Sequence, residues 1–176
     1  MQELRNLNHV NSLYIGSDNT IQDVAICNDI DSIKGGLFIS KVGNVSKQKA
    51  FEKLKFVGGD FSISGKNCSI SNLTYIGGSL LIDFDTLANS FLDKIEFVGN
   101  TIRLSYDNDI QGALKLKNVF GSLYISSCKL DNLAVIKNIK QVDELFEIYN
   151  MPNLISFKDL NDSLDIKKSL YLTNNP

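Results

Sequence analysis

A pair of apolar residues separated by one residue recurs along the whole chain at a nearly constant interval. The first members of successive pairs are 24, 24, 19, 22, 21, 23 and 24 residues apart. Self-similarity at a period of roughly 20–50 residues is the sequence signature of a repeat architecture. The pairs are Leu13/Ile15, Leu37/Ile39, Phe61/Ile63, Leu80/Ile82, Ile102/Leu104, Leu123/Ile125, Phe146/Ile148 and Leu170/Leu172.

Further apolar residues precede each pair at fixed distances, which defines the repeating unit as apolar-x-x-apolar-x-x-(Ile/Val)-x-Gly-x-apolar-x-apolar. Steps of three residues do not match the 3.6-residue period of an amphipathic helix. The closing apolar-x-apolar pair has the period of a strand with one face turned inward. The Ile/Val position, four residues before the pair, is filled by Ile33, Val57, Ile76, Val98, Val119, Val142 and Ile166.

Glycine or asparagine stands two residues before six of the eight pairs. Both residue types tolerate a positive φ, so we expect them to mark a recurring corner where the chain turns into a strand. The six residues are Asn11, Gly35, Gly59, Gly78, Asn100 and Gly121.

The repeat predicts an all-β fold, a right-handed parallel β-helix or solenoid of about eight coils with a period near 22 residues. A leucine-rich-repeat horseshoe with short helices is the alternative. One coil buries too little apolar surface to offset the entropy of ordering it, so the coils must be stable only as a stack. We therefore expect a single solenoid domain over residues 1–176, with a fragment of a longer repeat array as the alternative.

The strand signature Gly-Gly-x-Leu-x-Ile, preceded by Leu-x-x-Leu-x-x-Ile, resembles the receptor L domain. This leucine-rich, right-handed β-helix occurs in insulin- and epidermal-growth-factor-receptor ectodomains and in related microbial surface proteins. The resemblance covers nearly the whole chain and implies recognition at a cell surface, without catalytic residues. The disulfide-rich flanks of receptor L domains are absent. Only one coil, from Phe120 to Leu130, fits the leucine-rich-repeat consensus with Cys128 at its Asn/Cys position.

The composition points away from catalysis and from nucleic acid. The chain has one His, no Trp and three Cys, and its formal net charge is −2. No Walker loop follows the Gly-Gly pairs, and no apolar run approaches the ~20 residues that span a bilayer. We therefore expect no enzyme activity, no cofactor, no nucleic-acid partner and no transmembrane segment.

The residues that point away from the core on the strands form the candidate binding face. Aromatic residues beside small hydroxyl residues on a rigid sheet favour binding to a protein, with carbohydrate as the alternative ligand. High strand propensity of aromatic residues is the competing explanation. The candidate residues are Tyr14, Phe38, Leu81, Arg103, Tyr124, Tyr149 and Tyr171.

The segments between one strand and the next coil vary in length, which makes that edge of the solenoid a second candidate surface. These segments are roughly 16–26, 40–50, 64–69, 83–91, 105–112, 126–135 and 149–159.

Acidic residues in neighbouring coils offer a weak candidate for Ca²⁺, namely Asp83, Asp85, Asp107 and Asp109. With Arg103, three of them (Asp83, Asp85 and Asp107) could alternatively act on a polysaccharide. Asp in a loop is more often a turn residue, so we predict no metal site.

The sequence thus predicts a non-enzymatic recognition module, extracellular or at the cell surface, that binds through the sheet face and the variable-loop edge. A polysaccharide-acting β-helix and a cytosolic structural scaffold are the alternatives. Cys27 occupies an apolar position of the unit and is expected to be buried. Cys68 and Cys128 fall in loops too far apart to pair, and unpaired thiols mildly favour the cytoplasmic alternative.

Overall fold

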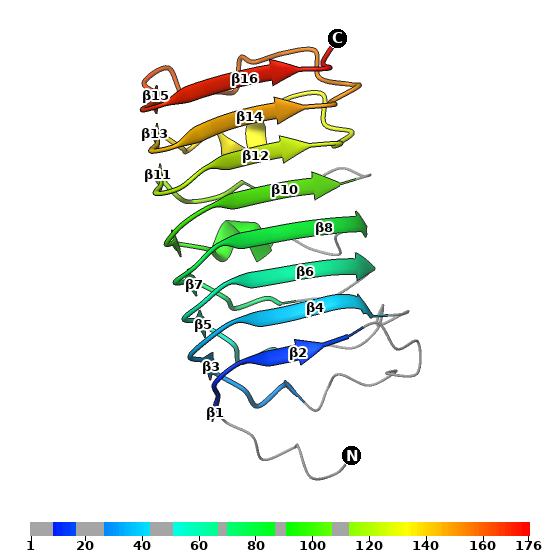
Figure 1. Cartoon of the computed structure of the whole chain (residues 1–176), viewed down its shortest axis with the longest axis vertical. Helices are drawn as coiled ribbons and strands as arrows, with labels where there is room; N and C mark the ends of the chain where they lie inside the picture. Colours follow the sequence, from blue (N-terminus) through cyan, green and yellow to red (C-terminus); the bar gives the residue numbers. More distant parts are fainter. Residues whose placement is uncertain (1–8, 17–26, 43–50, 67–69, 87–90, 107–112) are drawn as a thin grey trace.

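The chain forms a column of stacked coils (Figure 1). The structure is a computed structural model and describes residues 9–16, 27–42, 51–66, 70–86, 91–106 and 113–176. Each coil adds one longer strand to a wide sheet and one two-residue strand to the adjoining side of the column. The all-β parallel solenoid predicted from the repeat is confirmed.

The wide sheet contains eight parallel strands, and each one pairs with the strand of the next coil. Leu13 lies opposite Leu37, Leu37 opposite Phe61, and the same register continues to Leu170 opposite Phe146. The strands are β2 (Leu13–Ile15), β4 (Leu37–Val42), β6 (Phe61–Lys66), β8 (Leu80–Thr86), β10 (Ile102–Tyr106), β12 (Leu123–Ser126), β14 (Leu145–Tyr149) and β16 (Ser169–Thr173).

The short strands do not form one continuous row. They divide into a five-stranded sheet, β1-β3-β5-β7-β9, and a three-stranded sheet, β11-β13-β15. The prediction of about eight equivalent coils therefore holds for the wide face only. The short strands are β1 (His9–Val10), β3 (Ser32–Ile33), β5 (Phe56–Val57), β7 (Tyr75–Ile76), β9 (Phe97–Val98), β11 (Asn118–Val119), β13 (Gln141–Val142) and β15 (Asp165–Ile166).

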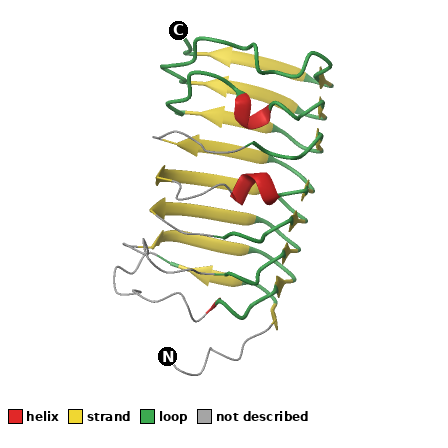
Figure 2. Cartoon of the chain, turned by 180° about the vertical axis from the view of Figure 1, so that it is seen from behind, coloured by secondary structure: helices red, strands yellow, loops and turns green. Residues whose placement is uncertain are grey.

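The core runs along the axis of the column and is built from the repeated apolar positions. Ile33, Val57, Ile76, Val98, Val119 and Val142 are fully buried, as are most of the inward residues of the wide sheet. Leu170 and Leu172 are 49% and 48% exposed because β16 lies at the edge of the stack. Two short 3₁₀ helices, η3 (Phe91–Lys94) and η4 (Ala134–Ile136), lie on the side opposite the wide sheet (Figure 2). The straight stack, with so little helix in its described part, does not match the horseshoe alternative.

The corner glycines serve a different purpose from the one the sequence suggested. None of the described glycines has a φ in the left-handed region. They are required because successive coils approach closely at the corner: a Cβ on Gly58 would lie 2.1 Å from the carbonyl oxygen of Lys34. A Cβ on Gly78 would lie 2.7 Å from the carbonyl carbon of Gly59. The missing Cβ, rather than backbone freedom, explains the repeated glycine.

Three of the four described non-glycine residues with left-handed backbone conformations lie at the exit from wide-sheet strands, and the fourth is Phe51. Ser127, Asn150 and Asn174 have φ values of 54°, 53° and 53° and follow β12, β14 and β16 directly. The turn lets the Ser127 amide donate to the Tyr149 carbonyl at 3.1 Å, and the Asn150 amide donate to the Thr173 carbonyl at 3.1 Å. A second corner of the coil is thus held by residues other than glycine.

Two segments of the variable-loop edge, 126–135 and 149–159, are fully described, and each has side chains both in the core and at the surface. Ile155 and Phe157 are 81% and 43% exposed, whereas other apolar side chains of these segments complete the core. Cys128, Leu130, Leu133, Met151 and Leu154 are buried. Most of the remaining loop edge (17–26, 43–50, 67–69, 87–90 and 107–112) and Cys68 lie outside the described residues.

Candidate functional site

The wide sheet aligns the predicted outward residues in one row across the column. The row lies between the two inward residues of each strand and is in register from β2 to β16. Tyr149 lies two residues after Glu147 on β14, and its partners in the neighbouring strands are Ser126 and Thr173. The row contains Tyr14, Phe38, Ser62, Leu81, Arg103, Tyr124, Glu147 and Tyr171.

An aromatic pair occupies the end of this row nearest the N-terminus. The rings of Tyr14 and Phe38 stack with centroids 4.7 Å apart and planes 7° from parallel. Tyr14 is 72% exposed, whereas Phe38 is half-buried and leans over Gly36, where a Cβ would lie 2.4 Å from the ring. Stacking fixes both rings at low entropic cost and leaves the Tyr14 edge and hydroxyl in solvent.

A cation–π pair, formed by an arginine and a tyrosine, occupies the middle of the row. The Arg103 guanidinium lies over the Tyr124 ring, 4.8 Å from its centroid, which is within cation–π range. Glu147 lies opposite Tyr124 on the next strand, and Leu81 lies opposite Arg103 on the strand before. The sheet therefore presents an apolar residue, a cation, a ring and an anion at consecutive strand spacings of about 4.8 Å.

The acidic residues proposed as a weak calcium or polysaccharide site do not form a carboxylate ladder where they are described. Asp83 is exposed on β8, and its neighbours in the adjacent strands are Ser64 and Ser105. The side chain of Asp85 is outside the described residues, as are Asp107 and Asp109. Among described residues, no group of three His, Cys, Asp or Glu side chains comes together to hold a metal ion.

The two described thiols are core residues. Cys27 and Cys128 are both buried, Cys27 as predicted and Cys128 within the loop that follows β12, where it was expected. Burial raises the pKa of the Cys27 thiol to about 11. Because the thiolate is the nucleophile, Cys27 is unreactive at neutral pH, and it has the character of a small apolar residue.

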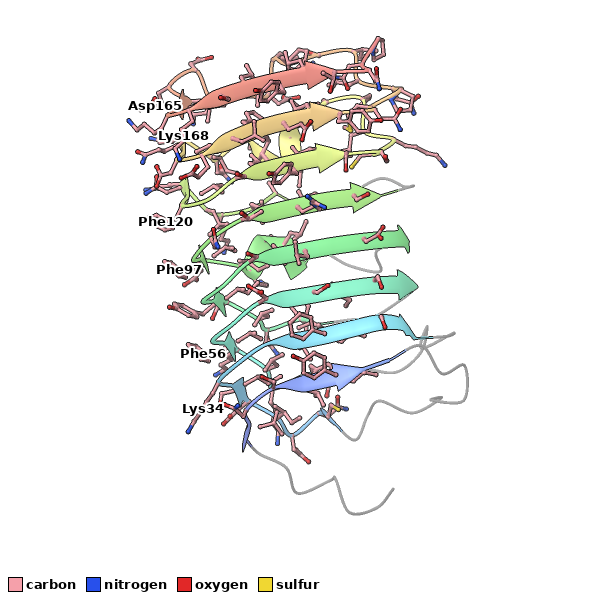
Figure 3. All side chains as sticks on the ribbon, viewed as in Figure 1. Lys34, Phe56, Phe97, Phe120, Asp165 and Lys168 are labelled. Carbon is pink, nitrogen blue, oxygen red and sulfur yellow. The ribbon has the colours of Figure 1, made fainter. Side chains whose placement is uncertain are left out.

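A second aromatic row, which the sequence reasoning missed, runs along the short strands. The rings of Phe56, Tyr75 and Phe97 stack at 4.8 Å and 4.7 Å, with interplanar angles of 11° and 10°. Phe120 continues the row at 5.7 Å but is tilted by 41°. Phe56, Phe97 and Phe120 project from this side of the column (Figure 3). The row could have been predicted from the sequence, because Phe56, Tyr75 and Phe97 each stand directly before the Ile/Val position of their coil.

Comparisons with protein-family profiles, with curated proteins and with solved structures find no match to this chain. The assignment of a parallel solenoid therefore rests on the observed strand pairing. Within the part of the chain that the structure describes, no helix is both long and apolar enough to cross a membrane.

Proposed function

We propose that this chain is a non-enzymatic recognition module that binds a protein partner through the wide sheet face. The observation that supports this most directly is the in-register row from Tyr14 to Tyr171 on a sheet whose inner face is buried core from β4 to β14. Such a face is rigid before binding, so little conformational entropy is lost when a partner docks. Tyr and Arg are also the residues most enriched among binding hot spots.

The mixture of groups on the row favours a protein over a carbohydrate. Phe38 covers one face of Tyr14, and Arg103 covers one face of Tyr124. The groups left for a partner include the outer face of Tyr14, which is 72% exposed, together with the charges of Arg103 and Glu147. This combination suits the mixed polar and apolar contacts of a protein interface.

The proposal extends to a receptor-L-domain-like solenoid that acts outside the cell or at its surface. The Gly-Gly-x-Leu-x-Ile signature and the parallel coil stack support this kinship. The buried cysteines Cys27 and Cys128 are compatible with either compartment, because neither is accessible for disulfide exchange. The sheet face carries the proposal because its outward residues are aligned in register across all eight strands. The loop edge, where Ile155 and Phe157 are exposed, is the surface that the control variant below tests.

The test compares a triple variant, Tyr14→Ala/Phe38→Ala/Tyr124→Ala, with wild type. A partner is identified by crosslinking to wild-type protein, and its affinity for each purified variant is then measured by titration calorimetry. Loss of three hot-spot side chains should weaken binding at least about 100-fold. The matched control is Ile155→Ala/Phe157→Ala, which removes two exposed apolar side chains away from the sheet and should bind normally. Equal affinity of wild type and the triple variant would refute the sheet-face assignment.

A further inference from the structure

The row of short strands is interrupted between β9 and β11, and the interruption opens a hollow. Elsewhere the Phe97 amide donates to the Thr74 carbonyl at 3.2 Å, and the Gln141 amide donates to the Lys117 carbonyl at 3.1 Å. No described backbone hydrogen bond joins residues 96–98 to residues 117–120. The hollow has a volume of about 310 Å³, within the size range of ligand pockets. Its lining includes Glu96, Phe97, Lys115, Lys117, Asn118 and Phe120.

The interruption coincides with a change in the repeat. Gly58, Gly77 and Gly99 occupy the position directly after the Ile/Val residue of their coils, and Phe120 occupies it in the next coil. A Cβ alone does not break the pairing, because Lys34 and Asp143 occupy the same position and their amides donate to the carbonyls of Val10 and Val119. The interrupted coil differs in the large ring of Phe120, which tilts over Phe97.

The interruption leaves backbone groups available to a ligand. By analogy with the coils on either side, the amides of Asn118 and Phe120 would donate to the carbonyls of Glu96 and Val98. Glu96, Val98, Asn118 and Phe120 all line the hollow, and no backbone hydrogen bond joins them across it. Their donors and acceptors are left as at the edge of a sheet. An extended peptide recognises such groups through its own backbone.

The side chains around the hollow supply an aromatic wall and positive charge. Asn118 stands where the three preceding coils carry Phe56, Tyr75 and Phe97. The coil of Asn118 therefore offers no ring at this position to stack in parallel on Phe97. Phe120, 47% exposed, tilts over this position.

Lys115 and Lys117 are exposed and form no ion pair with any described residue. They face one lining carboxylate, that of Glu96. Two further exposed lysines, Lys94 and Lys140, occupy the equivalent positions of the adjacent coils, where Asp143 already accepts a hydrogen bond from Gln141. This local excess of cations stands out in a chain of net charge −2.

We infer that the hollow between β9 and β11 is a docking site for an acidic peptide segment of a partner protein that carries one aromatic anchor. The anchor ring stacks on Phe97 beside Asn118, and its flanking carboxylates pair with Lys115 and Lys117. The peptide backbone bonds to the amides left open by the interruption. This site is separate from the wide sheet face and does not depend on the role proposed for that face.

The test is fluorescence anisotropy with labelled peptides on the full chain. Asp-Glu-Phe-Asp-Glu should bind with a Kd below about 1 mM, and its affinity should fall with added salt. Asp-Glu-Gly-Asp-Glu and Lys-Arg-Phe-Lys-Arg should each bind at least about tenfold more weakly. Absence of saturable binding, or equal binding of the peptide without the ring, would overturn the inference.

Charge reversal locates the site. Lys115→Glu/Lys117→Glu should weaken the acidic peptide at least about tenfold, because two attractive contacts become repulsive. Lys34→Glu/Lys55→Glu makes the same change of charge next to β3 and β5, where pairing is unbroken, and should bind as wild type. Lys34 projects from the same side of the column as Phe120 (Figure 3). An equal loss in both variants would mean nonspecific attraction and would overturn the site, as would an equal affinity for the first variant and wild type.

Amide hydrogen exchange tests whether pairing is lost between β9 and β11. The Phe120 amide should exchange its hydrogen faster than the Gly99 amide, which donates to Ile76 at 2.9 Å. Phe120→Gly restores the glycine corner, so it should slow exchange at residue 120 and abolish peptide binding. Phe120→Leu keeps a large apolar side chain and should keep exchange fast. Slow exchange in the wild type, or full peptide binding by Phe120→Gly, would contradict the inference.

Discussion

A Cβ on Gly77 would lie 2.2 Å from the carbonyl oxygen of Gly58. This contact couples two consecutive corners of the solenoid, because the oxygen belongs to the backbone and cannot rotate away. The spacing of the coils at this corner is therefore set by the absence of a side chain on Gly77.

Gly77→Ala should destabilise the fold by about 2 kcal/mol, since relieving the clash requires the coils on both sides to move apart. Gly16→Ala is the matched control, because nothing lies within 4 Å of its Cβ position. Urea denaturation of both variants measures the difference in free energy of unfolding. A Gly77→Ala variant as stable as Gly16→Ala would contradict the close-approach explanation.

Tyr75 should contribute more to stability than Tyr14, although both are exposed aromatic residues in a stack. Tyr75 lies between Phe56 and Phe97 and contacts a ring on each face, whereas Tyr14 stacks on Phe38 alone. Each such pair contributes about 0.5–1.5 kcal/mol beyond burial.

Tyr75→Ala is therefore expected to lower the free energy of unfolding about twice as much as Tyr14→Ala, measured in the same urea titration. A Tyr75/Phe97 double-mutant cycle isolates the ring–ring energy. A coupling energy near zero would show that the row is an incidental alignment.

Asn150 should tolerate glycine but not alanine. Its φ of 53° lies in the left-handed region, which costs most residues about 1–2 kcal/mol and asparagine or glycine much less. Asn150→Ala is thus expected to lower the thermal midpoint, whereas Asn150→Gly should leave it nearly unchanged. Calorimetry measures the thermal midpoint of both variants. Identical midpoints would contradict the explanation that Asn150 is required for its left-handed backbone conformation.

The apolar repeat was sufficient to predict which residues face the core and how the wide sheet is aligned. Inward positions such as Phe61 and Leu80 must be apolar in every coil, so stacking identical coils brings like positions into register. The outward row that contains Tyr14 and Arg103 followed from the same alternation.

The corner side could not be predicted from the same pattern. Glycine has two physical uses, a positive φ and a missing Cβ, and a single sequence does not distinguish them. The consequence of Phe120 depends on the distance between coils, which only the three-dimensional structure supplies. Inward packing of Cys128 and Met151 was missed because the segments that hold them differ in length and break the period.

The stability of the chain should fall at alkaline pH in a way that depends on Cys27. Burial raises the pKa of this thiol from 9.0 to about 11 in the native state. Between these values the unfolded chain releases a proton that the native chain retains, so ionisation favours unfolding as pH rises from about 9 to about 11. Below pH 9 the thiol is protonated in both states and makes no pH-dependent contribution.

Urea titrations of wild type and Cys27→Ala across this range test the effect. Cys27→Ala should begin less stable, because it leaves a small cavity, but its free energy of unfolding should decline less steeply above pH 9. The comparison removes the common contribution of lysine and tyrosine titration, which both proteins share. Parallel declines in the two proteins would show that the Cys27 thiol ionises as readily in the native chain as in the unfolded chain.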